Sequence, residues 1–261
     1  MRHTVKSIIN IIEDFAPLRT DYGCDNSGLL FGGKDWEVKG VLITLDLMPE
    51  TVSEAIKNNC NLIVVHHPPI FTPINAFNIS LPTHNAFCNA IKHDIAIYSA
   101  HLNVDFAEKG LNYRLMKTLG GENIAPVDGD SFNGLKATLK APMSLKNFAL
   151  HCKAVLKDET LTYLGDDNKI IKSFTAINGG GASESAVLAS KNAGADVFLS
   201  ADFKYHLLLL AKGINCAIIN FGHYHSEIAF IDLIHEVLVK NGLGEMAVKS
   251  KNHSPIAKFL G

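Results

Sequence analysis

The chain has 261 residues, of which 47% are hydrophobic and 19% are charged. This length and composition suit one large globular domain or two small ones, each with a real core. The formal net charge of -2 gives no broad attraction to nucleic acid or to anionic lipid. We therefore expect neither a nucleic acid nor a membrane as partner.

The N-terminal segment and the cysteines favour a cytoplasmic protein. Residues 1–17 combine isoleucines with charged side chains, and the segment is too short and too charged for a signal peptide or a membrane span. We expect an amphipathic helix there. The five cysteines are odd in number and contain no Cys-x-x-Cys pair, which supports neither a disulfide framework nor a thiolate zinc site. A reducing cytoplasm fits this pattern.

Helix and strand signals alternate in the first half of the chain. A helical pattern follows each of three short apolar runs, and this order predicts βαβ units with largely parallel pairing. The expected strands are 38–45, 61–65 and 95–100, and the expected helices are 49–58, 83–93 and 112–119.

Shorter alternations fill the second half, which opens after Gly120-Gly121. They predict a second α/β lobe with segments at 135–139, 145–155, 173–178, 183–193, 197–200 and 204–211. A final strand, 214–221, and a final helix, 226–240, are expected to return to the first lobe. The predicted fold is α/β, with two lobes of mixed, largely parallel sheets. We expect the lobes to be 1–121 completed by 214–261, and 122–213.

Side chains of the kinds that bind metals follow three of the predicted strands. They are His66 and His67 after 61–65, His101 and Asp105 after 95–100, and His223 and Glu227 after 214–221. In open α/β sheets the ligand crevice lies outside the carboxyl ends of the strands. We therefore expect these side chains to gather in one cleft, at one edge of a sheet.

The spacing of these residues suits a mixed nitrogen and oxygen site. The prolines after the His66-His67 pair can redirect the strand end so that both imidazoles turn toward one crevice. His223 and Glu227 are four residues apart, which puts both on one helical face if Ser226 does not interrupt the turn. Such a donor set favours Zn, Mn, Fe or Co over a closed structural zinc site. The alternatives are a packing turn and a solvated surface pair.

Two segments of the second half have the character of substrate contacts. Gly179-Gly180-Gly181 lies between a strand-like run and a helix, where backbone N–H groups can approach an anion. The turn lacks the Gly-Lys-Ser/Thr ending of a P-loop, so a tight strand-to-helix turn is an equal alternative. Lys204 lies in the second segment, 201–206, together with an acid and an imidazole. Its alternative is a solvated helix start.

Six stretches of the sequence form a specific set of motifs. They are 25–30, 64–71, 98–105, the triple glycine, 202–206 and 222–227. Over nearly the whole chain, this set resembles the GTP cyclohydrolase I type 2 homologues, also called the NGG-one-interacting-factor-three-like family. The resemblance implies a homohexameric ring and a dinuclear metal centre, with His101 beside the metals. The implied ligands are His66, His67, Asp105, His223 and Glu227.

The resemblance implies a metal-dependent hydrolase of the GTP cyclohydrolase type, acting on a nucleotide or a related phosphorylated small molecule. Two divalent metal ions would activate water, with Asp105 or Glu227 as a bridge and His101 as general acid or base. The glycine turn and Lys204 would hold phosphate. The alternative is a non-catalytic metal-binding protein for storage, delivery or scaffolding. A DNA-binding ring would need a dense run of Lys and Arg, which the sequence lacks.

Overall fold

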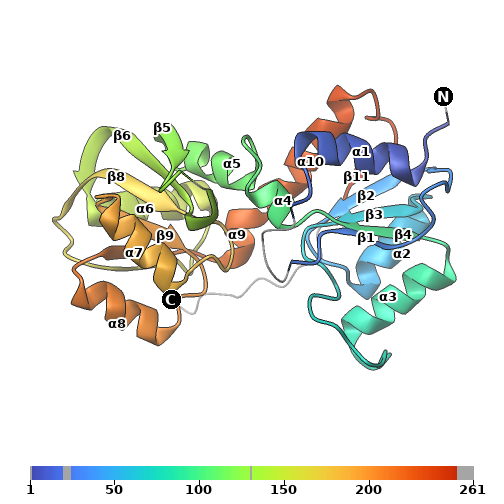
Figure 1. Cartoon of the computed structure of the whole chain (residues 1–261), viewed down its shortest axis with the longest axis horizontal. Coiled ribbons are helices and arrows are strands. Elements are labelled where there is room, and N and C mark those ends of the chain that lie inside the picture. The colour runs from blue at the N-terminus through green and yellow to red at the C-terminus, as the bar shows by residue number, and fades with distance from the viewer. Residues whose placement is uncertain (1, 20–24, 130, 252–261) are drawn as a thin grey trace. The chain divides into compact units, whose positions relative to one another are not determined.

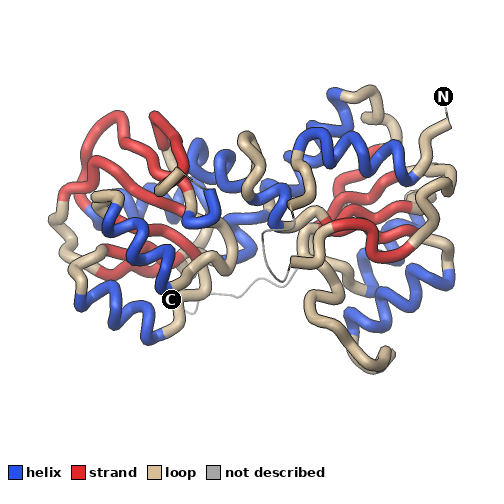
Figure 2. Tube along the Cα trace, viewed as in Figure 1, coloured by secondary structure: helices blue, strands red, loops and turns tan. Residues whose placement is uncertain are grey.

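The protein is described by a computed structural model that covers residues 2–19, 25–129 and 131–251. The chain divides into two compact units, shown in Figure 1. The first unit takes the described residues of Met1–Ala107 and Ile228–Pro255, and the second takes Glu108–Glu227. Each unit combines one sheet with several helices, as Figure 2 shows. The α/β class predicted from the sequence is confirmed.

The sheet of the first unit is largely parallel. Its order is β1-β4-β3-β2-β11, in which only β1 runs antiparallel to its neighbour. Every residue of β2, β3 and β4 is buried, which is why these strands appear as continuous apolar runs. The strands are β1 (Gly28–Phe31), β2 (Val41–Thr44), β3 (Leu62–Val65), β4 (Ala96–Ser99) and β11 (Ala247–Lys249).

Helices cover both faces of this sheet. Figure 1 shows α1 and α10 on one face and α2 and α3 on the other. The N-terminal helix α1 forms because Val5, Ile8, Ile9 and Ile12 repeat at helical spacing and are all buried, while Thr4 caps the first turn. The helices of this unit are α1 (Val5–Phe15), α2 (Pro49–Lys57), α3 (Pro82–Lys92), α4 (Leu102–Asp105) and α10 (Ala229–Lys240).

The sheet of the second unit is mixed. Its order is β5-β6-β8-β9-β10-β7, in which β8, β9 and β10 are parallel and the remaining pairs antiparallel. The strands are β5 (Gly121–Pro126), β6 (Leu135–Ser144), β7 (Thr162–Leu164), β8 (Ile170–Ala176), β9 (Val197–Ser200) and β10 (Ala217–Asn220).

Two apolar clusters pack the helices of the second unit against its sheet. One includes Phe148 and Phe174, whose ring centroids are 5.1 Å apart, and joins α5 and α6 to the strands. The other includes Val187 and Phe198 and joins α7 and α8. The helices are α5 (Leu111–Thr118), α6 (Leu145–Leu156), α7 (Glu184–Asn192), α8 (Tyr205–Gly213) and α9 (His223–Glu227), with a short 3-10 turn at Ser131–Asn133.

The final strand does not return to the first sheet, and this prediction was wrong. The strand expected at 214–221 is β10, which pairs in parallel with β9 and antiparallel with β7. The helix expected at 112–119 is α5, which packs on β5, β6 and β8. The units therefore change at 107/108 and 227/228, whereas the expected boundaries were 121/122 and 213/214.

The C-terminal helix expected at 226–240 is in fact two helices, α9 and α10. The chain leaves the second unit at the end of α9 and enters the first unit with α10. Within the described residues, no helix combines the length and apolar character that a membrane crossing requires.

Candidate metal centre

The first unit brings three of the predicted site residues together at the carboxyl ends of β3 and β4. These strands are parallel neighbours, with Val65 opposite Ser99, so the residues that follow them meet at one edge. One ligand atom each from His66, His101 and Asp105 lies within 4.8 Å of the others. The Nε2 atom of His66 is 3.6 Å from Oδ1 of Asp105.

His67 belongs to the same group of side chains. The ring centroids of His66 and His67 are 4.9 Å apart, and those of His66 and His101 are 5.1 Å apart. His66 is fully buried and Asp105 nearly so, a costly place for a carboxylate unless it is paired or binds a cation. The group has nitrogen and oxygen donors with no sulfur, which fits a divalent transition metal.

Each histidine of this group has an oxygen against Nδ1. The partners are the carbonyl of Ala100 at 3.0 Å for His66, Asp46 at 2.8 Å for His67 and Asp25 at 2.7 Å for His101. A carbonyl or carboxylate oxygen can only accept, so Nδ1 carries the proton and donates it. Nε2 is then the nitrogen with a lone pair for a metal or a proton, as in most histidine metal sites.

The segment 25–27 fixes His101 from a distant part of the chain. The Ser27 hydroxyl donates to Asp25 Oδ2 at 2.5 Å and accepts the backbone N–H of His101 at 3.2 Å. Burial raises the pKa of the Asp25 carboxyl, but hydrogen bonds from His101 and Ser27 lower it more, and the result lies below the ordinary value of 3.8. Asp25 therefore stays ionised and holds the imidazole in one orientation.

The second unit carries the other pair, on the short helix α9 that follows β10. His223 Nε2 is 2.9 Å from Oε2 of Glu227, so Ser226 does not interrupt the turn. Instead its hydroxyl donates to the carbonyl of His223 at 2.7 Å. Nδ1 of His223 donates to Asp202 at 2.6 Å, which repeats the arrangement found in the first unit.

The glycine turn lies directly against this pair. Gly179 has a φ of +54°, and a Cβ there would be 1.9 Å from Oε1 of Glu227 and 3.0 Å from Nε2 of His223. Its N–H donates to the Ser226 hydroxyl at 2.9 Å. Gly179 therefore makes room for the candidate ligands and helps to orient them.

The other predicted phosphate contacts surround the same turn. A Cβ on Gly180 would be 3.5 Å from Oδ2 of Asp202, whereas one on Gly181 would meet the side chain of Ile177. Lys204 is exposed and stands at the N-cap of α8, two residues after Asp202. The turn and the 201–206 segment are thus neighbours within the second unit.

A buried aspartate that sequence reasoning missed supports the start of α9. Asp158 is fully buried, and its carboxylate accepts the N–H of Gly222 at 2.6 Å and the N–H and hydroxyl of Thr160. Nε2 of His225 is 3.8 Å from the same carboxylate. Asp158 therefore ties the turn before His223 to the loop after α6.

The candidate ligands come from two sheets, so the prediction of one sheet edge was wrong. β3 and β4 place His66, His67, His101 and Asp105 in the first unit, and β10 leads to His223 and Glu227 in the second. The supporting residues Asp46 and Asp158 were missed. Asp46 follows the end of β2 and could have been found by the rule that gave the histidines, whereas Asp158 has no such signal.

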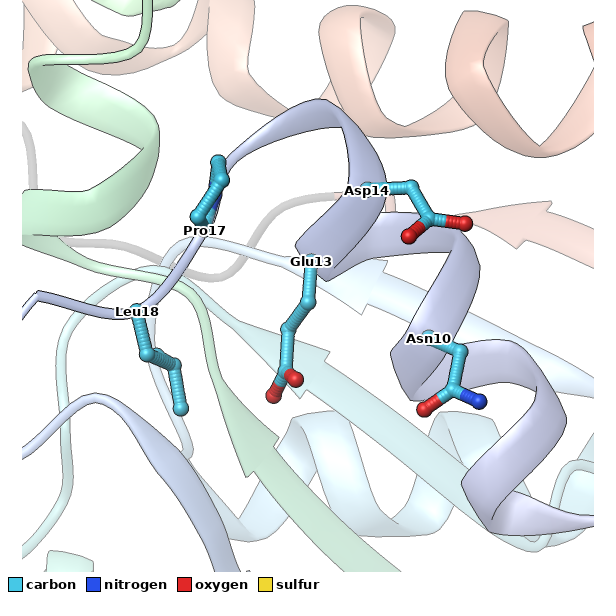
Figure 3. Close-up of a pocket in the computed structure, with 5 residues that line it drawn as sticks. All are labelled: Asn10, Glu13, Asp14, Pro17 and Leu18. Carbon is cyan, nitrogen blue, oxygen red and sulfur yellow. The ribbon is translucent and has the colours of Figure 1, made fainter.

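A surface pocket of the first unit lies beside the C-terminal end of α1. It is lined by Asn10, Glu13, Asp14, Pro17 and Leu18, and Figure 3 shows Glu13 and Leu18 projecting in the same direction. Glu13 accepts a hydrogen bond from the buried Tyr98 hydroxyl at 3.2 Å. The Asn103 amide, on α4, donates to the carbonyl of Ala16 at 2.8 Å. Among the described residues that line this pocket there is no predicted site residue and no histidine.

Known proteins resemble this chain over almost its full length. A GTP cyclohydrolase 1 type 2 homolog of Clostridium acetobutylicum is 30% identical over 265 residues, which cover 98% of each chain. A homolog of the same name from Methanocaldococcus jannaschii is 29% identical, covering 90% of this chain and 95% of the relative.

Solved structures share the fold. A Bacillus cereus protein related to NIF3 matches with a TM-score of 0.89 at 21% identity, over 99% of both chains. Reduced HcgD from Methanocaldococcus jannaschii matches with a TM-score of 0.80 at 28% identity, over 96% of this chain and 99% of that one. Residues 3–255 match the family described as Duf34/NIF3 (NGG1p interacting factor 3), and the chain belongs to this family.

Proposed function

We propose that the protein binds two divalent metal ions and acts as a metal-dependent hydrolase of the GTP cyclohydrolase type on a nucleotide or related phosphorylated small molecule. The observation that carries the proposal is the shared arrangement of the histidines. His66, His67, His101 and His223 each have an oxygen against Nδ1, so Nε2 is the ring nitrogen that would bind a metal or take a proton. The proposed ligands are His66, His67, Asp105, His223 and Glu227.

The proposed ligands come from both units, with His66, His67 and Asp105 in the first and His223 and Glu227 in the second. The chain leaves the first unit after Ala107 and returns after Glu227, so Asp105 and Glu227 each lie close to a crossing. The ring of Phe230, shortly after Glu227, packs 4.8 Å from the ring of His66 within the first unit. The first unit alone carries three of the proposed ligands, the number of protein ligands that a catalytic zinc takes.

The site residues would have different chemical roles. Bound divalent ions would supply Lewis acidity and lower the pKa of water. His101 would accept or give a proton at Nε2, because Asp25 occupies its Nδ1. Asp202 and Asp46 would hold His223 and His67 in the orientation that binding requires.

The phosphate of the substrate would be held in the second unit. The glycine turn lies beside the His223–Glu227 pair, and the exposed Lys204 is close in sequence to Asp202. We propose that Gly179, Gly180 and Gly181 offer a close backbone approach and that Lys204 supplies the charge.

Metal analysis of purified proteins tests the centre. The parent, expressed and purified anaerobically, should carry two equivalents of a transition metal, with Zn, Fe, Mn and Co measured together. His66→Ala, Asp105→Ala and Glu227→Gln should each lower the content well below that of the parent, because each change removes a donor atom from the proposed centre. Unchanged occupancy in all three variants would refute the ligand assignment.

The rival function is a non-catalytic metal-binding protein for storage, delivery or scaffolding. A protein of that kind would use the same metal ligands, but Lys204 would have no role in it. If Lys204 holds phosphate, Lys204→Ala should weaken nucleotide binding by about 1.5 to 3 kcal/mol, the scale of a hydrogen bond to a charged group, with metal content intact. Calorimetric titration of the metal-loaded protein with GTP and related nucleotides measures this. If neither protein binds nucleotide, the rival becomes the better account.

We also propose a cytoplasmic location and assembly into a homohexameric ring. The cysteines Cys60, Cys88, Cys152 and Cys216 are free thiols, as is usual in a reducing compartment. The ring is proposed from the resemblance of the motifs to those of the family.

A further inference from the structure

Phe71 places an aromatic ring against the histidine assigned to proton transfer. Its ring centroid is 6.0 Å from that of His101, with the two planes at 86°. This is the edge-to-face geometry that aromatic pairs prefer. Yet 46% of the Phe71 surface remains exposed, so a large part of an apolar ring faces solvent beside His101.

The segment that orients His101 also holds the backbone next to Phe71. The Asn26 amide donates to the carbonyl of Ile70 at 2.5 Å, while Asp25 and Ser27 on either side bind His101. The Ile70 side chain packs against the apolar core of the first unit. Phe71 therefore has a fixed backbone and a fixed relation to His101, although its ring is half exposed.

Another phenylalanine of the same loop has a different environment. Phe77 is 45% exposed, but it stacks on Phe87 of α3 at 5.5 Å and contacts His84. Packing on α3 accounts for its position. Phe71 contacts an imidazole of the candidate metal centre instead, so packing on α3 does not explain it.

The segment that carries Phe71 has no formally charged side chain. The sequence contains no Asp, Glu, Lys or Arg between Lys57 and Lys92. The exposed part of the Phe71 ring offers an apolar, π-faced surface. Planar heterocycles bind such rings by stacking, and each base–aromatic contact contributes about 1 to 3 kcal/mol.

We propose that Phe71 forms a stacking subsite for the planar heteroaromatic ring of the substrate. This proposal rests on the proposed function and narrows its substrate class to molecules that carry a nucleobase-like ring. The ring of the substrate would lie on Phe71, next to the imidazole of His101. Phe71 thereby determines specificity, whereas the phosphate contacts give affinity to any phosphorylated ligand.

A matched pair of probes separates the contribution of ring stacking from that of the phosphate contacts. GMP and ribose 5-phosphate carry the same sugar and phosphate, but only GMP has the ring. In calorimetric titrations of the metal-loaded protein, the parent should bind GMP more tightly than ribose 5-phosphate. Phe71→Ala should weaken GMP binding roughly 5- to 150-fold, the fold-change that corresponds to one stacked base. Its affinity for ribose 5-phosphate and its metal content should remain those of the parent.

Two further variants serve as controls. Phe71→Tyr keeps the aromatic face and should retain the preference for GMP. Phe77→Ala removes an equally exposed ring from the same loop and should behave as the parent.

The outcomes are distinct. Equal losses for both probes in Phe71→Ala, or a loss of metal, would assign Phe71 to packing and overturn the subsite. A parent that binds both probes equally would overturn the subsite but leave the phosphate proposal standing. A parent that binds metal but neither probe would overturn both.

Discussion

The residues that orient the imidazole rings should have a measurable effect on metal binding. Asp46 accepts the Nδ1 proton of His67, and Asp202 accepts that of His223. A carboxylate in this position fixes the ring and raises the basicity of Nε2. The aspartates should therefore affect metal binding although they are not assigned as ligands.

Asp46→Ala should lower metal affinity by about 10- to 100-fold, the usual cost of losing such an outer partner. Competition with a chromophoric chelator measures this constant. Asp232→Ala is the control, because Asp232 is exposed and pairs with Lys249 on the surface of the same unit. Equal affinities in the parent and in Asp46→Ala would mean that His67 needs no support from Asp46.

His101 should separate metal binding from turnover. If it transfers protons, His101→Ala should keep its metal and lose about 10² to 10⁴ in rate. Metal content and nucleotide turnover are measured on the same preparation. A ring nitrogen of His101 lies within 4.8 Å of ligand atoms of His66 and Asp105, close enough for all three to bind one ion. A joint loss of metal and activity would therefore make His101 a ligand. Unchanged turnover would remove it from the mechanism.

At the scale of elements, the turn between β8 and α7 packs closely against the His223–Glu227 pair because Gly179 has no side chain. Gly179→Ala should reduce metal content and lower stability by about 1 kcal/mol or more, because alanine is strained at positive φ and its Cβ would meet Glu227. Metal analysis and thermal melting measure the two effects.

Gly194→Ala provides the matched control for that turn. Gly194 has a φ of +68°, but a Cβ there would meet nothing within 4 Å. The Gly194→Ala variant should lose stability through backbone strain but should keep its metal. If the two variants lose stability alike and both keep their metal, the close approach of Gly179 to Glu227 is not needed.

The sequence predicts the elements whose signals are local. β2, β3, β4 and β9 are short apolar runs, and the helices between them repeat at helical spacing, so both are visible in one segment at a time. β1, β7 and β11 are mostly exposed or only partly buried, so they form no continuous buried run and are defined by their neighbours in the sheets. The break between α9 and α10 is hidden because the helical pattern continues across it.

The assignment of β10 to a sheet depends on distant partners. An apolar strand fits beside any parallel neighbour with a buried face, and its own residues do not say which one. The same limit applies to the site. The ligand candidates follow strands and can be recognised, whereas Asp158 acts through Gly222 from a loop far away in sequence.

At the scale of the whole molecule, the first unit has a long segment, partly exposed, that is free of formal charge. From Asn58 to Ile91 the sequence contains no Asp, Glu, Lys or Arg. Apart from Phe71, which is assigned to the substrate, and Phe77, which stacks on Phe87, the large hydrophobic side chains exposed along it are Ile74, Ile79, Leu81 and Ile91. Exposed apolar surface of this kind is typical of contacts between proteins.

If the chain forms the proposed homohexamer through this segment, copies can meet there without like-charge repulsion. Light scattering should then give six times the monomer mass for the parent. Ile79 is 64% exposed, and Ile79→Lys should shift the mass to smaller species, because an ammonium group would be buried without a partner. Leu209→Lys adds the same charge at an exposed position of the second unit and should leave the mass unchanged. A monomeric parent would refute the ring, and a hexameric Ile79→Lys variant would place its contacts elsewhere.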